Sequence, residues 1–251
     1  MLLVDTPIRV STSVVAVATA VASRSPSRRA PTLRVERSYF ADGHVVVAGS
    51  DEVGRGSLSG PVTAGIVVVD ERTRRVPTGL RDSKLLTPKA REQLVPKIQR
   101  WAVGFAVGHA SAAEIDALGI LAALRLAGER AIAMLDVGLS VIVLDGNYDW
   151  FSRPPRAPQA PIARAPDTVA LRIKADLTCA SVAAASVLAK VERDGLMREM
   201  ARDHPVYGWD VNKGYATPDH MAALREVGPC VEHRRSWNLP GDDAQLALSL
   251  D

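Results

Sequence analysis

The stretch Val45-Val-Val-Ala-Gly-Ser-Asp51-Glu52-Val-Gly54-Arg55-Gly56 decides how this chain is interpreted. An apolar run typical of a buried strand leads directly into two adjacent acids. Ionised carboxylates at such a place need a cation or hydrogen bonds to offset their lost hydration. Neighbouring strand side chains point to opposite faces, so Asp51 and Glu52 can share a site only where the strand ends or curls, which Gly54 permits. Standing alone, such a pair is usually a solvated strand end.

Two further acids follow apolar runs of the same kind. The run 141–144 ends in Asp145, and the run 169–173 is followed by Asp176 and a long alanine-rich helix. Asp176 is compatible with an ordinary helix cap as well as with a metal ligand. Sheet edges that collect acids from several strands are where α/β proteins build active sites. Four carboxylates without a His or Cys cluster favour Mg²⁺ or Mn²⁺, and two such ions can drive an in-line displacement at phosphorus.

The remaining pattern predicts an α/β protein with a layered sheet. Helix starts are marked by Thr87-Pro88, by Thr217-Pro218 and by the capping box that begins at Ser111. Pro96 is expected to kink the helix that follows Thr87. Apolar runs that alternate with helical segments predict five strands, at 45–50, 63–69, 101–108, 141–144 and 169–173.

Composition places the chain among globular proteins, with 47% hydrophobic and 24% charged residues. The nearly uncharged stretch 11–23 is too short to cross a bilayer, so no membrane association is expected. Cys179 and Cys230 match no metal-ligand or disulfide spacing, which predicts reduced thiols in a cytoplasmic protein. The net charge of +3 does not indicate nucleic-acid binding, because five arginines in residues 1–35 account for the excess.

The domain organisation follows from these features. Residues 1–40 are expected to form a disordered tail rich in Arg, Ser and Ala, residues 41–240 one catalytic domain, and residues 241–251 a flexible tail. The first 35 residues are also compatible with a targeting segment or with a start codon placed too far upstream. The proline-rich stretch 150–166 predicts an extended surface loop, whose arginines either touch substrate or are passive.

Taken together, the motifs resemble those of ribonuclease HII over about residues 45–237, in the family's order and spacing. The resemblance implies the ribonuclease H fold, a central five-stranded mixed sheet flanked by helices, with a helical C-terminal segment that helps to hold the substrate. The matching motifs are Asp51-Glu-Val-Gly-Arg-Gly56 with Gly60-Pro61, Asp82-Ser-Lys84, Leu144-Asp-Gly146, Ala180-Ser-Val-Ala-Ala-Ala-Ser-Val-Leu-Ala-Lys190 with Arg193-Asp194, Lys213-Gly-Tyr215 with His220, and His233-Arg-Arg-Ser236.

The resemblance also implies residue roles. It makes Asp51, Glu52, Asp145 and Asp176 the catalytic tetrad that binds two divalent ions, Mn²⁺ or Mg²⁺, with Asp51 as the bridge between them. Gly54, Arg55 and Gly56 are expected to contact the ribonucleotide 2′-OH largely through their backbone, the group that distinguishes RNA from DNA. Tyr215 is expected to stack at the RNA-to-DNA junction. Candidates for phosphate contacts are Lys84, Lys190, Arg193 and Lys213, although such residues are most often solvated surface charges.

The implied activity is that of a monomeric endonuclease in DNA replication and ribonucleotide repair. It hydrolyses the RNA strand of RNA/DNA hybrids and nicks duplex DNA 5′ of embedded ribonucleotides, leaving 3′-OH and 5′-phosphate ends. The chain departs from the family pattern at Ser57, commonly Pro, at Ala175, commonly Gly, and at Trp237, commonly Phe. Two alternatives remain open. Ribonuclease HIII usually carries an N-terminal domain for which residues 1–44 are too short, and an inactive hybrid-binding protein would have no need of all four acids.

Overall fold

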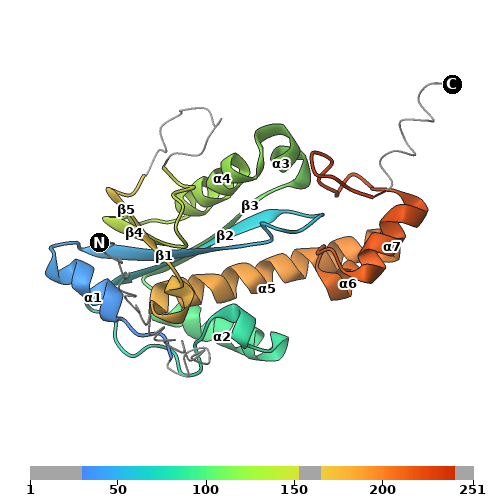
Figure 1. Ribbon diagram of the computed structural model, residues 1–251. Coiled ribbons are helices and arrows are strands. Elements are labelled where there is room, and N and C mark those ends of the chain that lie inside the picture. The colour runs from blue at the N-terminus through green and yellow to red at the C-terminus, as the bar shows by residue number, and fades with distance from the viewer. Residues whose placement is uncertain (1–29, 153–164, 241–251) are drawn as a thin grey trace, which may run out of the picture.

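The computed structural model describes residues 30–152 and 165–240, and it has a five-stranded mixed sheet at its centre (Figure 1). The strand order is β3-β2-β1-β4-β5. β1 pairs antiparallel with β2 and β2 with β3, whereas β4 runs parallel to both β1 and β5. The strands are β1 Val46–Val53, β2 Val62–Asp70, β3 Gly104–Ala110, β4 Val141–Asp145 and β5 Thr168–Arg172. The five predicted strands and the ribonuclease H architecture are confirmed.

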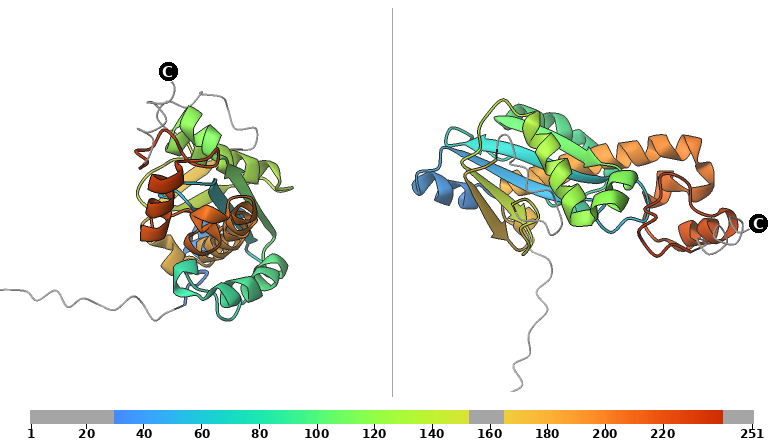
Figure 2. Two further views of the ribbon diagram at one scale, coloured as in Figure 1. Left: turned by 90° about the vertical axis from the view of Figure 1, so that its right-hand side faces the viewer. Right: turned by 90° about the horizontal axis from the view of Figure 1, so that it is seen from above.

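Helices cover both faces of the sheet (Figures 1 and 2). One face carries α3 (Ala112–Leu118) and α4 (Ile120–Ala133), and the other carries α1 (Arg34–Ala41), α2 (Pro88–Trp101) and α5 (Ala180–Asp203). Strand alternation separates the two cores, because Ala48 packs on the α4 side and its neighbour Val47 on the α5 side. α5 lies close against β1 and β2 because glycines face it. A Cβ at Gly49 would stand 2.3 Å from the Val182 nitrogen.

The predicted helix starts are confirmed. The Thr87 hydroxyl accepts from the Ala90 N–H at 3.3 Å, the Thr217 hydroxyl accepts from the His220 N–H, and Ser111 and Glu114 form a reciprocal capping box. α2 runs through Pro96 as one helix to Trp101. The third strand therefore starts at Gly104, later than the run 101–108 predicted, because Trp101 at the start of that run is the last residue of α2.

The N-terminal boundary of the folded part was placed too late. Residues 30–40 were assigned to a tail, but Thr32 forms a β-bridge with Cys179, and α1 begins at Arg34. Glu36 is fully buried, and its carboxylate accepts from the N–H and the hydroxyl of Ser181 at 2.8 and 2.7 Å. These contacts join segments far apart in the sequence, so local patterning did not reveal them. Residues 1–29 and 241–251 lie outside the described residues.

The proline-rich stretch begins inside the core. Trp150 and Phe151 are buried against α4, where ring atoms of both lie about 3 Å from the position of a Cβ at Gly128. The prediction of a surface loop over 150–166 was therefore wrong for its first two residues, and most of the rest lies outside the described ranges. The prolines in this stretch indicate a loop, but the large rings of Trp150 and Phe151 favour burial because each removes much apolar surface from water.

The C-terminal segment is helical, as expected, and extends beyond one end of the sheet (Figure 2). It contains the short helix η3 (Pro205–Tyr207), α6 (Trp209–Asn212) and α7 (Pro218–Val227). Its small core joins Tyr207 and Trp209 to Met197 on α5. In the described ranges, no helix has the length and apolarity to cross a bilayer, and both Cys179 and Cys230 are free thiols.

Candidate active site

Three parallel strands end at the same edge of the sheet, and the four predicted acids lie there. Asp51 and Glu52 are near the end of β1, and Asp145 is the last residue of the neighbouring strand β4. Asp176 lies in the short helix η2 (Ala175–Leu177) that follows β5. Asp176 is thus in a turn before α5, whose N-cap is Cys179, and it is not the cap itself.

The acids interact electrostatically. Asp51 is only 4% exposed, and burial, reinforced by the charges of Glu52, Asp145 and Asp176, raises its pKa well above the ordinary range, against the pull of Lys84. Burial likewise raises the pKa of Glu52, although Arg55 opposes the shift, and that of Asp176, with Asp145 as the next cause. The edge therefore carries more buried negative charge than its neighbours compensate.

Hydrogen bonds fix parts of this arrangement. Asp145 Oδ1 accepts from the Ala175 N–H at 2.6 Å, which ties β4 to the turn that carries Asp176. Lys84 Nζ lies 3.5 Å from Asp176 Oδ2. Burial lowers the pKa of Lys84, but the negative charges of Asp51, Asp82 and Asp176 outweigh burial, so the pKa is raised. Lys84 is the one predicted phosphate contact that lies beside the acids.

The donor set fits hard divalent cations. All four side chains offer carboxylate oxygens, and the raised pKa of Asp51 shows that added positive charge would be favourable there. Within residues 30–152 and 165–240, no three His, Cys, Asp or Glu side chains surround one point closely enough to form a finished metal site.

Three carbonyl groups of the glycine loop 54–61 accept hydrogen bonds from one buried arginine, Arg234. Arg234 donates from Nη2 to the Gly54 carbonyl at 2.6 Å, from Nη1 to the Arg55 carbonyl at 3.0 Å, and from Nε to the Gly60 carbonyl at 3.2 Å. In a trans peptide the N–H points opposite to the carbonyl. The N–H groups of Arg55 and Gly56 therefore point away from Arg234, toward the exposed side of the loop.

Arg193 does not serve as a free phosphate contact. Its side chain is fully buried, and it donates to the Pro61 carbonyl at 2.8 Å, the Lys213 carbonyl at 3.0 Å and the Ser57 hydroxyl at 2.9 Å. The expectation for this residue was wrong, since its guanidinium is committed to the loop. The same contacts explain Ser57, because its hydroxyl both accepts from Arg193 and donates to the Ser59 carbonyl.

Tyr215 reaches the site through the C-terminal segment. Its half-buried ring lies 5.6 Å from Arg193 Cζ and 5.9 Å from Lys190 Nζ. The Gly214 carbonyl accepts from the Leu58 N–H at 2.8 Å, so the residue before the tyrosine is bonded directly to the glycine loop. Lys190 is ion-paired with Asp194 at 2.7 Å, and the Lys213 amine donates to the Asp210 carbonyl.

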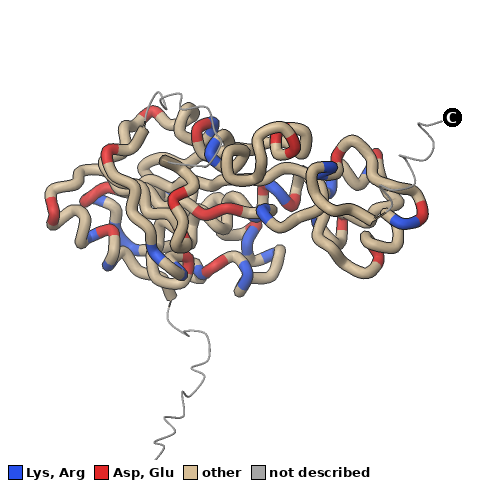
Figure 3. Tube along the Cα trace, turned by 45° about the horizontal axis from the view of Figure 1, so that its top comes forward, with Lys and Arg blue, Asp and Glu red and all other residues tan. Residues whose placement is uncertain are grey.

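Sequence reasoning missed two residues with large roles here, Arg234 and Glu36. Arg234 was quoted within a motif without a role, and only burial distinguishes it from the exposed Arg235 beside it. Glu36 lay in a segment taken for a tail. The charge pattern does not set Arg234 or Glu36 apart either, because acidic and basic positions are interspersed over the whole fold (Figure 3).

Comparisons with known proteins agree with this geometry. The family model described as ribonuclease HII matches residues 48–239. The ribonuclease HII of Streptomyces coelicolor is 47% identical over 208 residues, which cover 82% of this chain and 83% of the relative. The ribonuclease HII of a Ruegeria species is 44% identical over 207 residues, covering 82% of this chain and 84% of the relative.

Solved structures give the same result. Ribonuclease H2 from Pyrococcus horikoshii has a TM-score of 0.65 at 26% identity, and the match covers 82% of this chain and all of that one. The ribonuclease HII in a complex with PCNA from Archaeoglobus fulgidus has a TM-score of 0.59 at 25% identity, covering 76% and 93% of the two chains. The relatives, the family model and the fold agree, and the chain belongs to the ribonuclease HII family of endoribonucleases.

Proposed function

We propose that this enzyme hydrolyses the RNA strand of RNA/DNA hybrids and nicks duplex DNA 5′ of an embedded ribonucleotide, leaving 3′-OH and 5′-phosphate ends. Asp51, Glu52, Asp145 and Asp176 would hold two divalent ions, Mg²⁺ or Mn²⁺. Bound there, the ions would supply activation of water and neutralisation of charge at phosphorus. The observation that carries the proposal is the group of four acids at one sheet edge, where burial and then the charges of the other three raise the pKa of Asp51.

The glycine loop supports selection of a ribonucleotide. Arg234 holds the Gly54 and Arg55 carbonyls, so the N–H groups of Arg55 and Gly56 face outward. No hydrogen bond from either N–H to another described residue is present. Gly56 also has open space where a side chain would begin, which lets a sugar approach the backbone closely. A 2′-OH is a partner of matching size and polarity.

The other residues prepare the substrate. Lys84, placed beside Asp176, offers a positive charge to the scissile phosphate. Tyr215 offers a ring face beside the loop for stacking against a sugar or base at the junction. Lys190 lies beside this ring, and Lys213 is close enough to Lys190 to interact with its charge, so both would contribute positive charge there.

The test uses three matched duplexes: a uniform RNA/DNA hybrid, a DNA duplex with one ribonucleotide, and an all-DNA duplex. We expect the wild type to cut the first two in Mg²⁺ or Mn²⁺ and none in EDTA. Asp51→Asn should lose several kcal/mol of transition-state stabilisation, on the order of 10³-fold in rate, while the protein stays folded. Asp136→Asn, at an exposed acid after α4, is the matched control. Cleavage in EDTA, or near wild-type turnover by Asp51→Asn, would contradict the proposal.

A further inference from the structure

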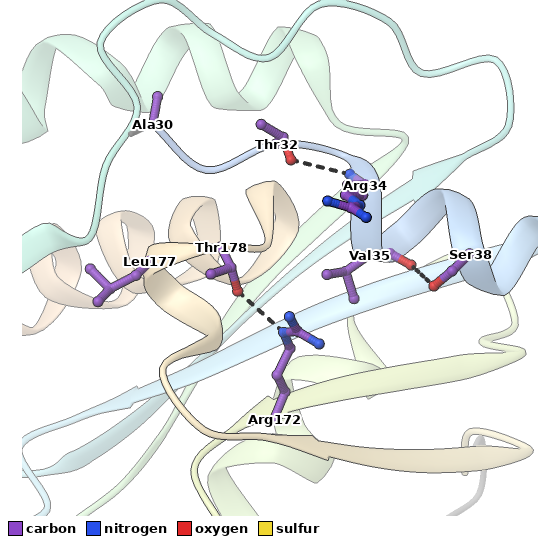
Figure 4. A pocket seen from close by; sticks show the side chains of 8 residues that line it. All are labelled: Ala30, Thr32, Arg34, Val35, Ser38, Arg172, Leu177 and Thr178. Carbon is purple, nitrogen blue, oxygen red and sulfur yellow. Dashed lines mark hydrogen bonds between the residues drawn. The ribbon is translucent and has the colours of Figure 1, made fainter. Parts of the chain in front are cut away.

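A hollow with a volume of about 770 Å³ lies between α1, the end of β5 and η2 (Figure 4). Arg34 lines it from α1 and Arg172 from β5, and the Arg172 side chain extends from the strand toward the side that carries Arg34. Thr178 lines the same space from the end of η2. We call this space the Arg34–Arg172 hollow.

The charge in the hollow is unbalanced. No acidic side chain is among the described residues that line it, and neither arginine is ion-paired within the described part of the chain. Arg172 Nε donates to the Thr178 hydroxyl at 3.2 Å, which orients the guanidinium and leaves its remaining N–H groups for a ligand. Two guanidinium groups that line one hollow, with a nearby hydroxyl, suit a phosphate, whose oxygens accept several charge-assisted hydrogen bonds.

The position of the hollow connects it to the reaction. Arg172 is the register partner of Asp145, on the adjacent strand about 4.8 Å away. Leu177 and Thr178 directly follow Asp176 along the chain. Consecutive phosphates of one strand are spaced about 3.4 Å apart along a duplex axis. A strand whose scissile phosphate lies at the acids therefore has other phosphates within reach of the hollow.

We propose that the Arg34–Arg172 hollow binds a backbone phosphate of the substrate, a few nucleotides from the bond that is cut. The inference rests on the proposed function, because it takes a nucleic-acid strand to lie across the four acids. It assigns to α1 and β5 a share of substrate binding that none of the predicted contact residues provides.

The experiment measures binding of a labelled RNA/DNA hybrid in EDTA, which prevents cleavage, over a range of salt concentrations. Arg34→Gln/Arg172→Gln should bind more weakly and flatten the log Kd against log salt slope by about 0.9, the value for one lost phosphate contact. The matched control is Arg37→Gln/Arg75→Gln, which removes the same charge from two exposed arginines beside the neighbouring smaller hollow. Equal slopes for both double variants, or a wild-type slope for the first, would overturn the proposal.

Two further arms identify the source of the phosphate. The first arm uses hybrids shortened one nucleotide at a time from either end. Removal of the nucleotide whose phosphate binds in the hollow should lower the affinity of the wild type, in one step, to that of the Arg34→Gln/Arg172→Gln variant. A mononucleotide that raises the melting temperature of the wild type but not of the variant, with hybrid affinity equal in both, would show a site for free nucleotide and overturn the assignment. Cleavage in Mg²⁺ by the wild type tests the proposed function by itself. Absence of that cleavage would contradict the proposed function, whereas the binding measurements in EDTA test the hollow.

Discussion

Tyr215 combines a fixed backbone with a presented ring. Its carbonyl accepts from His220 Nδ1 at 2.9 Å, and its N–H donates to the Asn212 carbonyl at 3.0 Å. The ring lies beside Arg193 and Lys190, and neither of these side chains covers it fully. Such a residue is suited to substrate selection, because its stacking face is available and its position is set by other groups.

Tyr215→Ala should therefore impair substrate choice more than chemistry. Base–aromatic stacking is worth about 1–3 kcal/mol, or roughly 5- to 150-fold in kcat/KM. We expect that loss on a duplex with one ribonucleotide, a smaller loss on a uniform hybrid, and near recovery with Tyr215→Phe. Kinetics on both substrates, with melting curves to verify folding, measure the difference. Equal losses on both substrates together with a lowered melting temperature would mean that the ring acts only as packing.

At the scale of elements, the N-terminus of α5 is held by the segment before β1. The Ala180 N–H donates to the Thr32 carbonyl at 3.1 Å, and Ser181 donates to Glu36. Cys179 at the N-cap provides no side-chain cap, so Glu36 takes that role from another helix. Burial raises the pKa of Glu36, and its second oxygen has no partner among the described residues.

Glu36→Ala should lower the free energy of unfolding by about 2 kcal/mol, since it removes the cap and leaves a small cavity. Glu36→Gln should cost much less, because the amide oxygen still accepts from Ser181 and no buried charge remains. Urea denaturation of the two variants beside the wild type measures the difference. Identical stabilities for Ala and Gln would show that the hydrogen bonds to Ser181 contribute little.

A second element-scale feature is the histidine pair inside the C-terminal segment. His220 Nε2 and His233 Nε2 are 3.1 Å apart, and burial, with the charges of His220, Arg235 and His204, lowers the pKa of His233 to about 4. A proton on His233 is therefore unfavourable in the folded state, in which the Cys230 N–H donates to Nδ1 at 3.1 Å.

This lowered pKa makes stability depend on pH. Below pH 6.5 the unfolded chain binds a proton at His233, whereas the folded protein does not until about pH 4. The free energy of unfolding should thus fall as the pH drops through this window, by up to about 1.4 kcal/mol per pH unit from this group. Urea denaturation at pH 7 and pH 5 should show a smaller fall for His233→Gln. Parallel curves for the two proteins would contradict the assignment.

At the scale of the whole molecule, the corrected N-terminal boundary determines which truncations are tolerated. Removal of residues 1–29 leaves Thr32 and Glu36 in place, so kcat and the melting temperature should match those of the full chain. Removal of residues 1–37 takes away the cap on α5 and should lower the melting temperature by several degrees. Differential scanning calorimetry of both truncations makes the comparison. An equal loss in both would show that residues 1–29 themselves stabilise the fold.

The sequence was most informative where chemistry is local. Strand runs that end in Asp51 and Asp145, and the hydroxyl caps at Thr87 and Thr217, were located because each signal spans a few residues. The roles of Arg193 and Arg234 could not be predicted in this way. A buried arginine and an exposed one look alike in sequence, and these two are set apart only by the carbonyls that converge on them from the glycine loop.

The bonds of Arg234 also bear on how the enzyme is made. β1, with Asp51 and the glycine loop, leaves the ribosome long before Arg234 does, yet the loop carbonyls at Gly54, Arg55 and Gly60 need that guanidinium. Until then, a nascent chain carries Asp51 and Glu52 next to a loop that lacks the hydrogen bonds from Arg234. The loop geometry on which the proposed recognition of a ribonucleotide depends is therefore expected only after synthesis has passed residue 234.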